Sequence, residues 1–225
     1  MKNNFNKKRN QFIFILLLFV ILYNGCKTTP VQTGRSSEST PRVLATKHFD
    51  EGIRLNFERN YRQAVNSFTN AIEIDPSFQG AYTVRGTAYF VLEMYHEALQ
   101  DYDKAISLGP QDYTFHTTAF YMRGRTYIEL EEYEKAVNDF TRLLFSMPLS
   151  WEAYKDRGIA NIFLERYEEA LLDLNKSIEI NPNNKEGYMT RGSLYAKLAD
   201  LTDDINIKNE YIERARADFE RGEAF

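Results

Sequence analysis

Residues 151–184 read WEAYKDRGIANIFLERYEEALLDLNKSIEINPNN. Within this stretch Gly158 is followed by Ala170, Leu174 and finally Pro182. The same order returns along the chain at nearly constant intervals. The equivalent glycines are Gly52, Gly86, Gly124, Gly158 and Gly192, and the equivalent prolines are Pro76, Pro110, Pro148 and Pro182. Successive glycines are 34, 38, 34 and 34 residues apart. A period of this length indicates a repeat architecture.

Other positions keep the same period. In each of the first four units an alanine stands 12 residues after the glycine, a large side chain four residues after the alanine, and a small or aliphatic residue three residues further on. These positions are Ala64, Ala98, Ala136 and Ala170; Phe68, Tyr102, Phe140 and Leu174; Ala71, Ala105, Leu143 and Ser177. Small residues let two helices approach closely, and large side chains fill the volume beside the contact. Each unit is therefore predicted to be a helical hairpin that stacks on its neighbours, and the proline separates one hairpin from the next.

This order of residues resembles the tetratricopeptide repeat (TPR) family. The resemblance implies an all-α fold, a superhelix (α-solenoid) of about five helical-hairpin units, with the first helix of each unit lining the concave side. The units lie at 45–78, 79–112, 117–150, 151–184 and, with an insertion, 185–225.

Two departures from the period have structural consequences. Residues 113–116 are extra, and four residues are close to one helical turn, so the first helix of the third unit is predicted to be one turn longer. In the fifth unit, Ala215 and Phe219 regain the pattern only if 11 residues are inserted within 196–213, which predicts a long hairpin with a turn near 203–206. No polar capping helix follows, so the last helix must cap itself or meet a partner, which makes homo-oligomerisation through this hairpin one possibility.

The N-terminus has the pattern of an export signal. Residues 1–10 carry four cations and no acid, and an unbroken apolar run of 12 residues follows at 12–23. Such a run is too short to span a bilayer comfortably. The segment resembles a bacterial lipoprotein signal, because the box Leu22-Tyr23-Asn24-Gly25-Cys26 ends in a small residue before the chain's one cysteine. The resemblance implies lipidation, with palmitate among the acyl chains, at Cys26.

The domains expected are therefore a signal peptide at 1–25, a lipid-anchored flexible linker at 26–41 and a TPR domain at 42–225. Tyr23 and Asn24 depart from the usual lipobox, as in the looser signals of spirochaetal lipoproteins, so an uncleaved signal anchor is the alternative. Both alternatives place the domain in the cell envelope, facing the periplasm or the exterior, because cations ahead of the apolar run favour an N-terminus inside. The sequence does not distinguish the inner from the outer membrane.

Charged residues also recur with the repeat. An arginine precedes four of the glycines, and the second helix of the same units carries an aspartate; unit one has neither. Because the two residue types occur together within a unit, we predict ion pairs across each hairpin. The alternative is an arginine ladder for an acidic ligand. The predicted pairs are Arg85 with Asp101, Arg123 with Asp139, Arg157 with Asp173 and Arg191 with Asp218.

The sequence offers little support for catalysis, so no enzyme activity, catalytic residue, metal site or cofactor is expected. The three histidines fall at unrelated repeat positions, and the phosphate-binding and nucleophile motifs are absent. A net charge of -4, from 28 basic and 32 acidic residues, disfavours nucleic acid as a partner. With catalysis and nucleic-acid binding disfavoured, we expect the protein to bind another protein.

The resemblance also implies which residues line a partner-binding groove. We expect an exposed apolar row with a few charges, suited to an apolar peptide or helix of another envelope protein, although several of these side chains could instead pack against the next hairpin. The expected function is a membrane-tethered scaffold or assembly factor; the alternative is a periplasmic subunit that binds a small molecule or lipid for a transporter. The groove residues are Phe49, Ile53, Phe57, Thr83, Thr87, Phe90, Tyr121, Arg125, Ile128, Lys155, Ile159, Ile162 and Met189.

Overall fold

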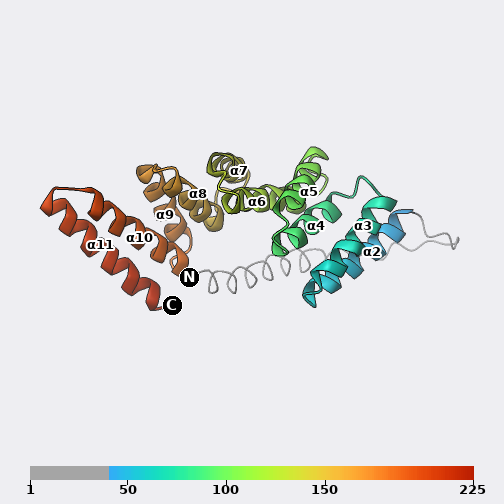
Figure 1. Ribbon diagram of the computed structural model, residues 1–225, viewed down its shortest axis with the longest axis horizontal. Coiled ribbons are helices and arrows are strands. Elements are labelled where there is room, and N and C mark those ends of the chain that lie inside the picture. Colours follow the sequence, from blue (N-terminus) through green and yellow to red (C-terminus); the bar gives the residue numbers. More distant parts are fainter. Residues whose placement is uncertain (1–40) are drawn as a thin grey trace. The chain divides into compact units, whose positions relative to one another are not determined.

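A computed structural model of the protein describes residues 41–225, and every regular element within that range is an α-helix (Figure 1). These residues form two compact units that divide between Ala119 and Phe120. The all-α repeat fold predicted from the sequence is confirmed. The signal peptide and Cys26 lie outside the described residues. Among the helices from residue 41 onward, none combines the length and the apolar character that crossing a bilayer requires.

The first unit contains two complete hairpins and the start of a third. Hairpin one pairs α2 (Pro41–Phe57) with α3 (Tyr61–Ile74), and hairpin two pairs α4 (Gln79–Val91) with α5 (Tyr95–Ser107). The helix α6 (Tyr113–Glu129) begins in this unit and ends in the second one.

The second unit holds the rest of α6, followed by α7 (Tyr133–Ser146). Two further hairpins follow. One pairs α8 (Trp151–Phe163) with α9 (Tyr167–Ile180), and the last pairs α10 (Lys185–Leu201) with α11 (Ile205–Glu223).

The repeat glycines allow the two helices of each hairpin to approach closely. A Cβ atom added at Gly86 would lie 2.8 Å from the Tyr102 ring, and one added at Gly52 would lie 2.5 Å from the Phe68 ring. The same clash would occur at Gly124 against Phe140. Because real Cβ atoms do not approach carbon so closely, a larger residue would force the helices apart. The spacing that revealed the repeats thus reflects this contact between glycine and a large side chain.

The turns inside four hairpins share one backbone conformation. Arg59, Glu93, Glu131 and Glu165 each have φ between 59° and 63°, in the left-handed region, just after the first helix ends. Residues other than glycine adopt this conformation at a cost of about 1 kcal/mol. Each of the four turns therefore contains one residue whose backbone conformation is unfavourable for its type.

The four extra residues lengthen α6, as the sequence predicts. The α6 helix has 17 residues where α4 and α8 have 13. Asp112 starts the extra turn, since its carboxylate accepts a hydrogen bond from the Thr114 N–H at 2.8 Å. The buried Phe115 ring then packs against Gly80 and, edge-on, against Phe49 at 6.1 Å between centroids. The added turn therefore contributes to the core of the first unit.

The last hairpin is long, which confirms the predicted insertion. Its helices have 17 and 19 residues, and residues 202–204 connect them. The Asp204 carboxylate accepts hydrogen bonds from the N–H groups of Asn206 at 2.8 Å and Ile207 at 3.2 Å, which caps α11.

Candidate binding surface

The structure places none of the predicted groove residues on a fully open surface. Eight of them are half-buried: Phe49, Ile53, Phe57, Arg125, Ile128, Ile159, Ile162 and Met189. The other five are buried: Thr83, Thr87, Phe90, Tyr121 and Lys155. The expectation of an exposed row is therefore wrong for these five.

In the first unit the buried residues bond within the fold. The Thr83 hydroxyl lies 3.1 Å from the Gln79 carbonyl and 3.3 Å from the Phe115 carbonyl, and no part of Thr83 is exposed. The Thr87 hydroxyl donates to the Thr83 carbonyl at 2.9 Å. Phe90 is also fully buried, with its ring centroid 5.7 Å from that of Tyr95. The repeat register correctly put these residues on the first helix, but the neighbouring helices cover them.

In the second unit Tyr121 joins α6 to α8. Its hydroxyl donates to the Asp156 Oδ2 atom at 2.8 Å, and only 6% of the residue is exposed. Tyr121 is therefore a structural contact and not the exposed anchor that its register suggested. Asp156 was not among the predicted site residues, although it follows Lys155 directly and is equally buried.

These residues belong to a polar cluster that we define as Tyr121, Arg125, Lys155, Asp156 and Glu186. The Lys155 Nζ atom lies 3.2 Å from Asp156 Oδ1 and 2.7 Å from Glu186 Oε2, which links α8 to α10. The Arg125 Nε atom lies 3.8 Å from Asp156 Oδ2. Two cations and two carboxylates thus compensate one another, as buried charges require.

The protonation states of the cluster follow from burial and charge. Burial, and secondly the Asp156 carboxylate, hold the pKa of Tyr121 well above its ordinary value of 10.0, so the phenol is a neutral donor at physiological pH. Burial acts to lower the pKa of Lys155, but attraction by Asp156 and Glu186 outweighs it and the pKa is raised. Lys155 therefore stays a cation although only 9% of its side chain is exposed.

Four apolar side chains lie on the same helices as the polar cluster. Ile128 on α6, Ile159 and Ile162 on α8 and Met189 on α10 remain half-buried. We call this set, together with the polar cluster, the helix-A face of the second unit. It combines accessible apolar surface with fixed charges, so it can hold a polypeptide segment by apolar contact and orient its polar groups.

The predicted arginine–aspartate pairs all form within their own hairpins. In each pair the arginine donates two parallel hydrogen bonds to one carboxylate, as in Arg157 to Asp173 at 2.9 and 2.6 Å. The other pairs are Arg85 with Asp101 at 2.8 and 2.7 Å, Arg123 with Asp139 at 2.7 Å twice, and Arg191 with Asp218 at 2.8 and 2.7 Å. The aspartates are 5–7% exposed, so these are structural pairs rather than a ladder for an acidic ligand.

Three of the arginines also bond to the preceding hairpin, which sequence reasoning missed. Arg157 Nη1 donates to Thr141 Oγ1 at 3.0 Å, and Arg85 makes the equivalent bond to Thr69 at 2.9 Å. Arg191 Nη1 donates to the side-chain Oδ1 atom of Asn175 at 2.6 Å. Each acceptor stands 16 residues before its arginine, a spacing that could have revealed the contact.

A second exposed apolar segment went unnoticed in the sequence. Phe145 lies near the end of α7, Met147 and Leu149 follow that end, and the three are 92%, 40% and 73% exposed. Phe145 and Leu149 have the i, i+4 spacing of one helix face, but α7 ends at Ser146, so the three side chains do not share such a face. As for metals, no cluster of three or more histidine, cysteine, aspartate or glutamate side chains in residues 41–225 is arranged to hold an ion.

Comparison with known proteins supports the repeat assignment. Two tetratricopeptide repeat models match residues 81–112 and 121–185. Sperm-associated antigen 1 of Rattus norvegicus is 35% identical over 91 residues, which are 39% of this chain and 10% of that protein. A DnaJ homolog subfamily C member 7 homolog of Dictyostelium discoideum is 40% identical over 50 residues, 22% of this chain and 9% of that protein. The chain thus spans about a tenth of the length of these curated relatives.

Solved structures show the same fold. MamA from Desulfovibrio magneticus RS-1 superposes with a TM-score of 0.70 at 16% identity, covering 80% of this chain and 96% of MamA. YrrB, described as a TPR protein with an unusual peptide-binding site, superposes with a TM-score of 0.62 at 23% identity, covering 80% and 90%. Together with the family matches, these superpositions show that the chain contains tetratricopeptide repeats at 81–112 and 121–185 in a TPR-like helical solenoid.

Proposed function

We propose that this protein is a lipid-anchored scaffold of the bacterial cell envelope that binds a segment of another envelope protein on the helix-A face of its second unit. The observation that carries the proposal is the combination on that face of half-buried isoleucines with the polar cluster. Apolar contact supplies affinity for a polypeptide, and the fixed charges select its register. The TPR fold supports a binding role over catalysis, and the peptide-binding site named for YrrB is consistent with it.

The envelope location in this proposal rests on the sequence of residues 1–26. A cationic start, a short apolar run and Cys26 together favour export and lipidation. Several acyl chains would anchor the protein far more firmly than one. The linker at 26–41 would then leave the repeats free to reach a partner near the membrane surface.

The test compares partner capture by two variants from native membranes. Replacing Ile128 and Ile159 by Ser removes apolar area from the helix-A face, whereas Leu172→Ser removes it from α9, where the side chain is 69% exposed. Each protein is affinity-purified after mild cross-linking, and co-purifying proteins are identified by mass spectrometry. A thermal melt checks that each variant is folded.

We expect the double variant to lose a protein that the wild type and Leu172→Ser both retain. Retention of every partner by a folded double variant would place the binding surface elsewhere. Recovery of a lipid or small molecule and no protein would favour the transporter-subunit alternative.

A further inference from the structure

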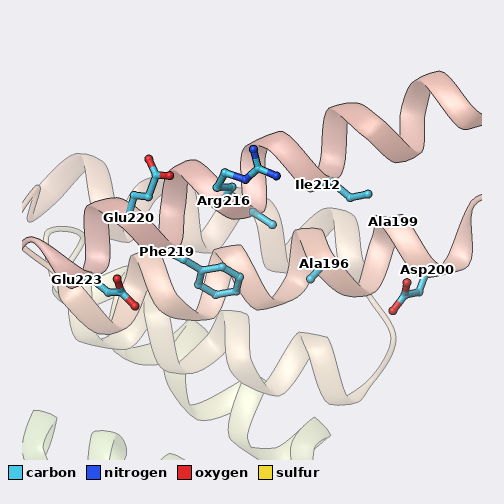
Figure 2. A pocket seen from close by; sticks show the side chains of 9 residues that line it. Ala196, Ala199, Asp200, Ile212, Arg216, Phe219, Glu220 and Glu223 are labelled. Carbon is cyan, nitrogen blue, oxygen red and sulfur yellow. The ribbon is translucent and has the colours of Figure 1, made fainter.

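A surface groove runs between α10 and α11 on the last hairpin, and none of the residues that line it belongs to the helix-A face (Figure 2). It encloses about 430 Å³, within the range of ligand pockets. Its floor is made of small and apolar residues, with Ala196 on one helix and Ile212, Ala215 and Phe219 on the other. Charged side chains stand around this floor.

The preceding hairpin shows what such a groove holds. On α8 and α9 the equivalent floor contains Ala170 and Leu174, and the α10 side chain Leu194 is buried against them with 1% of its surface exposed. Leu198, one turn further along α10, packs on the same cluster together with Ile162. Two leucines at positions i and i+4 therefore fill the groove of the fourth hairpin.

The residues of the two grooves correspond one to one. Asp173 and Asp218 make the same ion pair 45 residues apart, which fixes the register between α9 and α11. In that register Ala215 replaces Ala170 and Phe219 replaces Leu174. Tyr167, Leu171 and, on α8, Ile162 of the filled groove become Ile212, Arg216 and Ala196 of the last one. The hollow is thus the place where the next helix of the solenoid would lie, widened by the loss of the Ile162 side chain.

The charges of the rim define the occupant further. Asp200 lies at one end of the groove, and Glu220 and Glu223 lie at the other, with Arg216 beside Glu220 (Figure 2). The rim thus carries three carboxylates and one guanidinium. A helix that lies here is favoured if it carries lysine or arginine beside its apolar stripe.

A second copy of this chain does not fit that description. Leu194 and Leu198 stand two and six residues after Gly192, and the matching positions are Arg54 on α2, the first described helix, and Glu58 just after its end. Arg54 bonds to Glu58 and to Glu51 on the surface of α2. Stacking α2 of another copy into the groove would bury an ion-paired arginine and bring two carboxylates to an acidic rim.

We propose that the α10–α11 groove binds a basic amphipathic helix of another protein, in the position that α10 occupies on α8 and α9. The groove is distinct from the helix-A face, so this proposal stands or falls independently of the proposed function. From Ile212 to Glu223 the groove extends about 17 Å, which corresponds to roughly three helical turns. The occupant presents large apolar side chains at i and i+4.

The test uses two labelled peptides of about 14 residues, roughly four turns. Both carry leucines at i and i+4 and differ only in having lysines or glutamates beside them. Binding to the full chain in phosphatidylcholine nanodiscs is measured by fluorescence anisotropy, with empty discs as background. We expect the lysine peptide to bind and the glutamate peptide to bind at least about tenfold more weakly.

Variants of the groove then decide whether binding occurs there. Glu220→Lys with Glu223→Lys should reverse the preference between the peptides, and Ile212→Ser should weaken the lysine peptide about tenfold. The control Glu73→Lys with Glu213→Lys makes the same charge change outside the groove and should leave both affinities unchanged.

Three outcomes would overturn the proposal. The first is the absence of saturable binding, or equal binding by groove and control variants. The second is a dimer in light scattering that Ile212→Ser dissociates, because the occupant would then be a second copy. The third is stronger peptide binding after deletion of residues 1–25, because that segment of the chain would then be the occupant.

Discussion

Breaking the ion pair between Arg157 and Asp173 should strongly destabilise the second unit. The Asp173 side chain is 7% exposed and accepts two hydrogen bonds from Arg157, at 2.9 and 2.6 Å. Replacing Asp173 by Leu leaves the guanidinium without its carboxylate, and breaking a buried pair in this way costs about 3–5 kcal/mol. Because 21% of the Arg157 side chain is exposed, water compensates part of that loss, and we expect about 3 kcal/mol.

Removing both partners should cost much less than the two single changes suggest. In Arg157→Met with Asp173→Leu no buried charge remains, so we expect the double variant to lie within about 2 kcal/mol of the wild type. The free energies of unfolding come from urea denaturation followed by far-UV circular dichroism. With the single variants Arg157→Met and Asp173→Leu at about 3 kcal/mol each, the cycle should give a coupling energy of about 4 kcal/mol between the two residues.

The matched control pairs Arg157 with Asp139, the aspartate of the preceding hairpin. That cycle should give a coupling energy below about 0.5 kcal/mol, because Asp139 is bonded to Arg123. Stronger coupling of Arg157 to Asp139 than to Asp173 would refute the assignment of these pairs to single hairpins.

Three further predictions concern a turn, a buried phenol and the anchor. Glu165→Gly should stabilise the protein by about 1 kcal/mol in urea denaturation, because glycine adopts φ near 59° without strain, whereas Glu213→Gly in the middle of α11 should destabilise it by a similar amount; equal effects would contradict this. Tyr121→Phe should cost about 2 kcal/mol through the lost bond to Asp156. Because the folded state raises the pKa of Tyr121, the wild type should also lose stability as the pH rises above 10, and an unchanged alkaline profile in the variant would be contrary evidence. Cys26→Ala should abolish incorporation of labelled palmitate, and undiminished labelling would exclude lipidation there.

The hairpins were predictable from the sequence because their packing depends on residue size at fixed intervals. Gly86 must be small for the ring of Tyr102 to fit beside it, and that requirement leaves a visible period. The pairing of Arg85 with Asp101 was predictable for a similar reason: a repeat unit that has the arginine also has the aspartate, and unit one has neither.

The binding surface was less predictable because burial on the first helices depends on what the neighbouring hairpin contributes. The repeat register alone assigned Tyr121 and Lys155 to an open groove. It could not show that Asp156, on α8 beside Lys155, contacts both Lys155 and Tyr121 of α6. The groove at Phe219 was equally hidden, because it depends on how α11 lies against α10 in the folded hairpin.

Site-specific photo-cross-linking in intact cells tests the claimed scaffold function most directly. A photoreactive amino acid is placed at Ile159 on the helix-A face and, as a control, at Leu172, which is 69% exposed on α9. We expect that irradiation joins the Ile159 probe to a specific envelope protein and that the Leu172 probe gives no such adduct. The same adduct from both positions, or no protein adduct at Ile159, would contradict it.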